Sequence, residues 1–345
     1  MEVDHRPDDF EASTFIDDTP ISALTTMNYD QWEALLGTGG KMSYAKLEPV
    51  KSALILNGII NGVSIDFTGK RNVNRFGPNL PIDDEHIPKV TEVIMKDVES
   101  LKKAGPFSQQ PFKHMAISPI GAVPKKNSTK IRVIHHLSHP FKGDSVNENI
   151  IDEYLPISSF GHAAQAVREF GRYCYLVKLD VEAAYKQVPV RREDWPLLGF
   201  KWLDQWYYER VLPFGLRSSC RLWELYAAAL HHFFQHVLQC RGRRQIIHYV
   251  DDFLFVVESR DDAIALRDGA LKLCTGLGIP MAADKTEGPV TCLTFLGIQI
   301  DTTTMVASLP DDKLHEITTL TTSWVRKERA SIKEIQSLVG KLSFA

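Results

Sequence analysis

Apolar residues recur along this chain with two different spacings, one typical of helices and the other of strands. From Pro88 to Ala104 they return every three or four positions, and Gly105-Pro106 follows. This spacing predicts an amphipathic helix, because Pro suits a first helical turn and Gly-Pro ends one. Two further helices are predicted, one from a Ser158 or Ser159 N-cap to Phe170 and one over about 218–238.

Short runs of β-branched and aromatic residues predict buried strands. One of these strands, Tyr175–Leu179, ends on Asp180. Two more, Ile246–Val250 and Phe253–Val257, are separated by only Asp251-Asp252, which is the spacing of a tight hairpin. A second hairpin is predicted from strands at about 121–124 and 130–135, around a polar turn over 125–129.

Three carboxylates stand at the ends of the apolar strands. Adjacent charges at Asp251 and Asp252 repel each other unless a cation lies nearby. Asp is also a common turn residue, although one Asp would serve that purpose. If the strands are neighbours in one sheet, Asp180 and Asp251 converge and can hold two divalent ions, the arrangement that supports phosphoryl transfer. An all-oxygen ligand set favours Mg²⁺ or Mn²⁺ over Zn²⁺.

The composition is that of an ordinary globular protein, since 44% of the 345 residues are hydrophobic and 24% are charged. No run of about 18 apolar residues and no apolar N-terminal signal is present. We therefore expect an intracellular protein with no membrane partner, in the nucleus or the cytoplasm. The five cysteines form no C-x-x-C pair, which argues against a thiolate zinc site or a disulfide framework.

The net charge of -3 conceals a segregation of charge along the chain. Residues 1–100 carry 17 acidic and 9 basic side chains, and the remainder carries 26 and 31. The acids of residues 1–30 predict a disordered tail, followed by an N-terminal extension over 31–85. Between Leu101 and Gly143 there is no Asp or Glu, but there are eight Lys or Arg residues. This run is either a solvated face or an anion-binding surface.

Several strings of this sequence resemble the motifs of reverse transcriptases. Tyr249-Val250-Asp251-Asp252 resembles their Y-x-D-D motif, and Leu179–Tyr185 resembles their first aspartate motif. Three further matches follow in the family's order and spacing: Leu212-Pro213-Phe214-Gly215-Leu216, Lys285 after Gly278-Ile279-Pro280, and Phe295-Leu296-Gly297. The resemblance covers roughly residues 86–300.

A narrower resemblance concerns one subfamily. The stretch Ile131–Pro140, followed by Ser145-Val146-Asn147, is similar to reverse transcriptases of DIRS-like tyrosine-recombinase retrotransposons. Two departures from the wider family are visible. Ser218-Ser219 is followed by Cys220 where the family usually has Pro, and His135-His136 replaces a frequent His-Asp pair. The missing Pro puts the geometry of the loop at Ser218-Ser219 in doubt. The His-His pair lacks the carboxylate that the Asp would supply.

The resemblance implies an α+β, right-hand polymerase fold with fingers, a ferredoxin-like antiparallel palm sheet with helices, and a thumb that is only begun. Fingers and palm would occupy residues 86–305, with the fingers around 86–160. Residues 306–345 would start the thumb, because 336–345 resembles a helix at the start of the family's thumb. No ribonuclease H, integrase or recombinase segment is expected in these 345 residues.

The resemblance also implies roles at the carboxylates. Asp180 and Asp251 would be ligands of two Mg²⁺ ions, or of Mn²⁺, with Asp252 assisting and the Val181 carbonyl completing the coordination. Lys285 resembles the lysine that protonates the pyrophosphate leaving group. A lone loop lysine is, however, more often simply solvated.

Further matches imply contacts with a nucleotide. Tyr185 would exclude a ribose 2′-hydroxyl, although it could be an ordinary core tyrosine. Phe214 and Gly215 would lie under the template–nucleotide pair, where Gly allows close backbone approach. Leu296-Gly297 resembles the primer grip, or is a strand-end glycine. The cations expected to meet the triphosphate are Arg132 first, then Lys126, with Lys125 and Lys130.

The implied function is that of a retrotransposon RNA-directed DNA polymerase, which adds dNTPs to a primer on an RNA or DNA template and releases pyrophosphate. Two alternatives from other classes stay open. One is a catalytically inactive nucleic-acid-binding remnant of a retroelement, and the other is a two-metal phosphodiester hydrolase. An RNA-synthesising variant is disfavoured by Tyr185, and the oligomeric state is left open.

Overall fold

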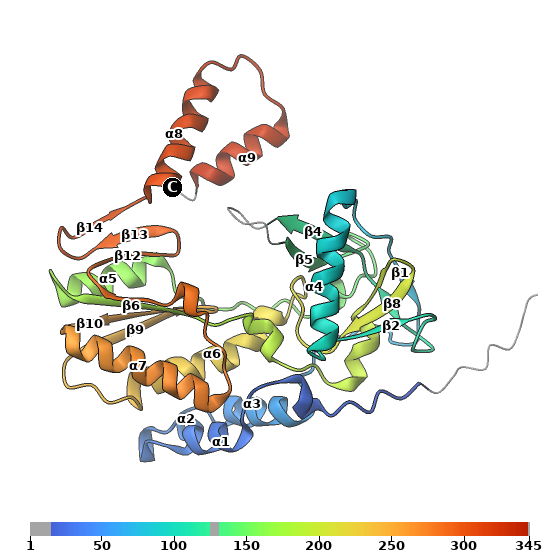
Figure 1. The fold of residues 1–345 in the computed structure, drawn as a ribbon, viewed down its shortest axis with the longest axis horizontal. Helices are drawn as coiled ribbons and strands as arrows, with labels where there is room; N and C mark the ends of the chain where they lie inside the picture. Colours follow the sequence, from blue (N-terminus) through green and yellow to red (C-terminus); the bar gives the residue numbers. More distant parts are fainter. Residues whose placement is uncertain (1–14, 125–130, 344–345) are drawn as a thin grey trace, which may run out of the picture. The chain divides into compact units, whose positions relative to one another are not determined.

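The computed structural model describes residues 15–124 and 131–343. The chain divides into two compact units. Unit 1 comprises Met1–Pro156, Val181–His232 and Cys274–Pro280, and unit 2 comprises Ile157–Asp180, Phe233–Leu273 and Met281–Ala345. Each unit is described by itself, and Figure 1 labels many of the helices and strands.

Unit 1 contains a five-stranded sheet with a hairpin and a long helix nearby. The strand order is β1 (Arg75–Phe76), β3 (Ala116–Ile117), β7 (Gly199–Trp202), β8 (Gln205–Glu209) and β2 (Lys103–Phe107). The hairpin pairs β4 (Ile120–Pro124) with β5 (Ile131–His135), as predicted. Helix α4 (Ile87–Glu99) buries Val90 and Ile94 against aromatic residues of β7 and β8 and against Ile120 and Ile131 of the hairpin.

Helix α4 is shorter than the sequence predicts, and the expectation that it runs to Ala104 is wrong. It ends at Glu99, and the residues from Lys103 form the strand β2, which pairs with β8. Gly105-Pro106 therefore lies inside a strand, where the register of the pair is irregular. Because β2 is at the edge of the sheet, a proline that cannot donate to a ladder is tolerated there.

The N-terminal region is ordered from residue 15 onward, so the expectation of a disordered tail over 1–30 is wrong for residues 15–30. The Asp17 carboxylate accepts hydrogen bonds from Tyr208 and from Arg210, and Leu24 and Met27 are buried. Residues 1–14 lie outside the described part of the chain. The helices α1 (Tyr29–Gly37), α2 (Tyr44–Leu47) and α3 (Pro49–Asn61) follow.

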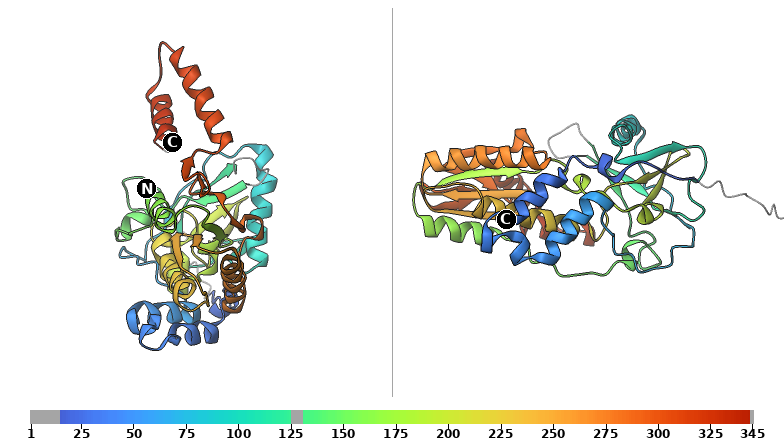
Figure 2. Two further views of the ribbon diagram at one scale, coloured as in Figure 1. Left: turned by 90° about the vertical axis from the view of Figure 1, so that its left-hand side faces the viewer. Right: turned by 90° about the horizontal axis from the view of Figure 1, so that it is seen from below.

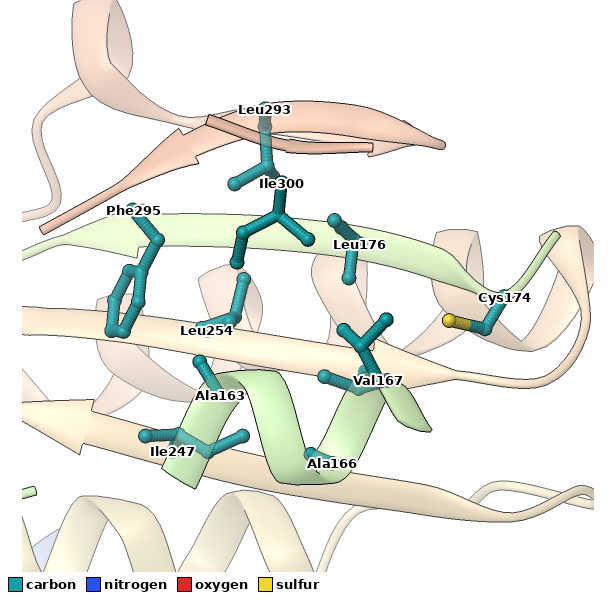
Figure 3. Packing of buried hydrophobic residues seen from close by; sticks show 11 residues of the cluster. Ala163, Ala166, Val167, Cys174, Leu176, Ile247, Leu254, Leu293, Phe295 and Ile300 are labelled. Atoms are coloured by element: carbon teal, nitrogen blue, oxygen red, sulfur yellow. The ribbon is translucent and has the colours of Figure 1, made fainter. Parts of the chain in front are cut away.

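Unit 2 is built on a four-stranded antiparallel sheet. Its strand order is β11 (Glu287–Val290), β6 (Tyr175–Asp180), β10 (Asp252–Val257) and β9 (Arg244–Tyr249). One face, with Leu176 and Leu254, packs against α5 (Phe160–Phe170) and against a small sheet of β12 (Cys292–Phe295), β13 (Ile298–Asp301) and β14 (Val306–Ser308) (Figure 3). The predicted Ser159 N-cap of α5 is confirmed by a capping box with His162.

The opposite face of this sheet carries aromatic side chains. Phe253 and Phe255 of β10 contact Phe234 of α6 (Ser219–His236), with ring centroids 5.2 and 5.4 Å apart. The right-hand view of Figure 2 shows α5 and α7 (Arg260–Leu277) on opposite sides of the sheet. Burial on both faces explains why β10 is apolar at every position after Asp252.

The last two helices of the described chain, α8 (Asp311–Val325) and α9 (Ile332–Leu342), form a helical hairpin (Figure 1). Lys341 forms an ion pair with Glu316 at 3.1 Å, and Ser331 with Glu334 caps α9. The predicted helix over 336–345 falls largely within α9. In the part of the chain that the structure describes, no helix is both long and apolar enough to cross a membrane.

Candidate active site

The hairpin of β9 and β10 presents the Tyr249–Asp252 motif. Its two-residue loop is Val250-Asp251, because Tyr249 and Asp252 are Cα partners. The loop therefore lies one residue earlier than the sequence predicts, and Asp252 begins β10. Val250 has φ of 57°, which such a tight turn requires of its first residue but which is unfavourable for a β-branched side chain by about 1–2 kcal/mol. The backbone is thus strained at the residue before Asp251.

Asp252 of β10 is the Cα partner of Asp180, the last residue of β6. Directly opposite residues of an antiparallel pair project from the same face of a sheet. The structure therefore places both carboxylates on one face at one end of the sheet, with Asp251 in the adjoining loop. The Asp180 carbonyl accepts a hydrogen bond from the Ala282 amide at 2.9 Å, which fixes the end of β6.

Lys285 contacts this group of carboxylates directly. Its Nζ lies 2.8 and 2.9 Å from the two carboxylate oxygens of Asp180. Partial burial lowers the pKa of the Lys285 ammonium, but the hydrogen bond to Asp180 and the charges of Asp180, Asp251 and Asp252 outweigh it and raise the pKa. Lys285 is therefore protonated at neutral pH and could donate a proton.

The carboxylates carry more negative charge than Lys285 neutralises. Burial, followed by the charges of Asp251 and Asp180, raises the pKa of Asp252 to about 6. An all-oxygen cluster with surplus negative charge is the environment that a hard divalent cation stabilises. The residues fit such a cation in chemistry and charge.

Their side chains do not already form a compact metal cage. Among the described residues, the trio of potential ligands whose atoms lie within 4.8 Å of one another is Asp83, Glu85 and His86, and both acids there are exposed. Exposed acidic groups of that kind are common without a metal, so we assign no role to this trio. The carboxylates at Asp180, Asp251 and Asp252 remain the predicted metal ligands, with the buried Val181 following Asp180.

Lys178 is a residue of this site that the sequence reasoning missed. It lies on the same face of β6 as Asp180, and its Nζ donates to the Thr294 carbonyl of β12 at 3.1 Å. Its Nζ also lies 3.5 Å from the Glu287 carboxylate. Lys178 thus connects the strand of Asp180 to the β12–β13 hairpin, which carries Leu296 and Gly297. A lysine inside an otherwise apolar strand was the available signal.

Unit 1 brings together three of the predicted nucleotide-binding residues. Tyr185 lies in a 3₁₀ helix, Ala184–Gln187, and its ring centroid is 5.1 Å from that of Phe214. The Arg132 guanidinium lies 5.2 Å from the Phe214 centroid, within the range of a cation–π contact. The other predicted cations, Lys125, Lys126 and Lys130, lie outside the described residues.

Gly215 is required by its surroundings. Its φ is 109°, and a Cβ built there would lie 2.0 Å from the His135 carbonyl oxygen. The loop is held by the buried Asn147, whose Nδ2 donates to the Gly215 carbonyl at 2.8 Å and whose Oδ1 accepts from the Arg217 amide at 2.9 Å. Sequence reasoning gave Asn147 no role, because nothing local indicates what its side chain contacts.

His135 occupies the position where relatives often have the histidine of a His-Asp pair. Its Nε2 lies 3.0 Å from the Gly199 carbonyl oxygen. Burial, together with the nearby Lys103 charge, lowers the pKa of His135 to about 3. The ring is therefore neutral near pH 7 and is part of the packed interior of unit 1.

These observations agree with a comparison of the sequence with known families. Residues 123–300 match the family described as "Reverse transcriptase (RNA-dependent DNA polymerase)". The chain belongs to the reverse transcriptase family. In the sequence, the match extends from β4 to β13 and includes every residue assigned above to the carboxylate cluster.

Two viral polyproteins are similar to this chain. The Gag-Pro-Pol polyprotein of Human T-cell leukemia virus 3 (strain Pyl43) is 26% identical over 273 residues, which are 77% of this chain and 17% of that polyprotein. The genome polyprotein of Petunia vein clearing virus (isolate Shepherd) is 25% identical over 157 residues, 44% of this chain and 6% of that polyprotein. The chain thus spans less than a fifth of the length of either relative.

Solved structures of a foamy viral protease-reverse transcriptase confirm the right-hand polymerase fold. The dRH form in complex with ds DNA has a TM-score of 0.63 and 17% identity, and the match covers 92% of this chain and 52% of that one. The complex with RNA/DNA hybrid gives the same TM-score and identity, and covers 40% of that chain. At this identity, the likeness concerns the fold.

Proposed function

We propose that this chain is an RNA-directed DNA polymerase of a retroelement, which catalyses attack of a primer 3′-hydroxyl on the α-phosphate of a dNTP and releases pyrophosphate. The observation that carries the proposal is the pairing of Asp252 with Asp180 in adjacent strands, with Asp251 in the loop between β9 and β10. Family membership supports the reaction class. The domain limits proposed above, with fingers and palm over 86–305 and a thumb from 306, belong to the same proposal.

Asp180 and Asp251 would hold two Mg²⁺ ions, or Mn²⁺, with Asp252 and the Val181 carbonyl in support. Such ions neutralise charge on the reacting phosphate and activate the attacking oxygen. Lys285 would protonate the leaving pyrophosphate, a role supported by its place at the carboxylates, with Nζ 2.8 and 2.9 Å from the two carboxylate oxygens of Asp180.

The nucleotide contacts of the proposal come from unit 1. Arg132 would bind the triphosphate, together with Lys125, Lys126 and Lys130. Tyr185 would exclude the ribose 2′-hydroxyl, and Phe214 and Gly215 would support the template–nucleotide pair. The contact of Tyr185 with Phe214, and of Phe214 with Arg132, supports a common role for these three side chains.

The proposed partners are dNTPs and an RNA or DNA template with its primer. The structurally similar foamy viral protease-reverse transcriptase was solved in complex with ds DNA and with RNA/DNA hybrid, which supports this choice. We further propose a DIRS-like element as the source, on the resemblance of Ile131–Pro140 and Ser145–Asn147 to that subfamily.

Primer extension tests the function. Purified protein is mixed with Mg²⁺, dNTPs and an RNA template bearing a DNA primer, and extended products are resolved by length. We expect extension by the wild type and a loss of at least about 100-fold in Asp251→Asn, because the substitution removes a carboxylate ligand of the ions that would neutralise charge on the reacting phosphate. Thermal unfolding of both proteins checks that the variant is folded.

Three outcomes would contradict the proposal. No incorporation by folded wild type would favour a nucleic-acid-binding remnant. Incorporation unchanged in Asp251→Asn would place the chemistry elsewhere. Cleavage of the template that persists in Lys126→Ala and Arg132→Ala would indicate a hydrolase, which needs no triphosphate-binding cations.

A further inference from the structure

Unit 1 contains a chain of four charged side chains, of which three are buried and the fourth, Lys186, is partly exposed. Lys103 is 4% exposed, and its Nζ lies 2.6 Å from both carboxylate oxygens of Glu209 and 3.1 Å from the Asp97 carboxylate. Asp97, 7% exposed, also accepts two hydrogen bonds of 2.6 Å from the Nζ of Lys186. The order Glu209, Lys103, Asp97, Lys186 alternates in sign, so each charge has a partner.

Such a network is a poor way to stabilise a fold, because burying charges costs much of what their attraction returns. The network instead fixes the positions of its side chains. A buried charge that moves away from its partner is left uncompensated, which raises the free energy of the folded state. Burial alone would raise the pKa of Asp97, but Lys103 and Lys186 outweigh it and hold the pKa below its usual value. Asp97 is therefore ionised near neutral pH and fixes the Lys186 ammonium.

Lys186 directly follows Tyr185 in the 3₁₀ helix Ala184–Gln187, so the network fixes the backbone beside Tyr185. The other end of the turn is fixed as well. The Gln187 backbone carbonyl accepts a hydrogen bond of 2.7 Å from the Thr25 hydroxyl, and the Gln187 side-chain Nε2 donates to the Glu182 carbonyl at 3.0 Å. The short helix therefore cannot turn without breaking the partly buried ion pair of Lys186 with Asp97.

We propose that Lys186 is a positioning residue, which, anchored on Asp97, holds Tyr185 against Phe214 and so sets the discrimination between deoxyribonucleotides and ribonucleotides. This inference rests on the proposed function. A ribose differs from a deoxyribose by one oxygen atom, so a steric filter against it depends on the placement of one ring. Displacements of about 1 Å at a reacting site can change rates by 10²-fold.

The test compares kcat/KM for a dNTP and for the matching rNTP on one primer-template. In Lys186→Met, which keeps the length of the side chain and removes its charge, we expect the preference for dNTP to fall at least about tenfold. Lys186→Arg keeps the ion pair and retains most of the preference. General destabilisation would lower both rates equally and leave their ratio unchanged.

Arg71→Met is the matched control. Arg71 pairs with the buried Asp194 at 2.6 Å in the same unit, and Asp194 keeps Arg191 as a partner, just as Asp97 keeps Lys103 in Lys186→Met. The dNTP preference of Arg71→Met should equal that of the wild type. Asp97→Asn is a second route to the same loss, for use if Lys186→Met does not fold.

The outcomes separate the inference from the function on which it rests. An unchanged preference in active Lys186→Met or Asp97→Asn overturns the role of Lys186 and leaves the polymerase proposal standing. An equal fall of the dNTP preference in Arg71→Met also overturns the role of Lys186, because the loss of any ion pair in unit 1 would then be enough to reduce the preference. If folded wild type incorporates no nucleotide, the proposed function fails, and the inference fails with it.

Discussion

Asp252 lies directly opposite Asp180, as the first residue of β10 and the last residue of β6. This register depends on the loop of the β9–β10 hairpin, because a slip by one residue would turn Asp252 to the other face of the sheet. The conformation of this loop therefore determines whether Asp252 and Asp180 lie on the same face of the sheet. The first residue of the loop, Val250, has a backbone conformation that valine rarely adopts.

Replacing Val250 by glycine should stabilise the fold. Glycine adopts a φ near 57° without steric cost, and this relief exceeds the added flexibility of the unfolded chain. We expect Val250→Gly to raise the free energy of unfolding by about 0.5–1 kcal/mol in urea titrations. Val306→Gly, at an exposed strand position of the same unit, should lower it by about 1 kcal/mol. A loss of stability in Val250→Gly would contradict the strain at this loop.

Gly215→Ala should damage both stability and nucleotide binding. A Cβ at this position lies 2.0 Å from the His135 carbonyl oxygen, so the loop of Phe214 must move. We expect a loss of at least about 3 kcal/mol in unfolding free energy and a raised KM for dNTP.

Gly171→Ala is the control, since Gly171 has φ of 83° but no atom within 4 Å of the added Cβ. Its cost should be about 1–3 kcal/mol, from the backbone conformation alone, with no change in KM. Equal effects of the two substitutions would contradict this prediction. The requirement for glycine at position 215 would then come from the backbone conformation alone and not from the contact with His135.

Lys178→Met should weaken binding of the primer, because Lys178 holds the hairpin that carries Leu296 and Gly297, which resemble the primer grip of the family. The substitution removes the hydrogen bond to the Thr294 carbonyl and the ion pair with Glu287, which together connect β6 to the β12–β13 hairpin. We expect the KM for primer-template to rise about tenfold, with a smaller change in kcat and partial rescue by Lys178→Arg. Lys272→Met, at an exposed position of α7, should leave both parameters unchanged. A fall in kcat alone would indicate that Lys178 acts on the carboxylates and not through the hairpin.

The sequence predicted those elements whose signals are local. The N-cap of α5, the β4–β5 hairpin and the strand that ends on Asp180 all follow from patterns of a few residues. Lys103 shows the limit of such reasoning, because it belonged to a basic run that was a candidate anion-binding surface. In the fold it is buried against Glu209, which is 106 positions away. The roles of Asn147 and Lys186 likewise depend on partners that are distant in sequence.

The N-terminal segment provides a pH-dependent test of such a distant contact. The Asp17 side chain is 5% exposed and accepts hydrogen bonds from Tyr208 and Arg210. Burial acts to raise the pKa of Asp17, but hydrogen bonds from Tyr208, Thr19 and Arg210 outweigh it and lower the pKa below its usual value. Because the pKa is lower in the folded state, the ionised carboxylate stabilises the fold above the unfolded pKa, and this stability is lost as pH falls through the folded pKa.

Asp17→Asn should therefore lower the free energy of unfolding by about 1–3 kcal/mol at pH 7, which is typical of a hydrogen bond to a charged group. The difference from the wild type should shrink as the pH falls from about 4 toward the lower folded-state pKa, because Asp17 is protonated first in the unfolded chain and then, at lower pH, in the folded protein. Asp18→Asn removes the neighbouring, exposed acid and should leave stability near that of the wild type at both pH values. Urea titrations at pH 7 and at low pH measure all three proteins. A difference for Asp17→Asn that stays constant with pH would show that packing of this side chain, and not its charge, attaches the N-terminal segment to the rest of unit 1.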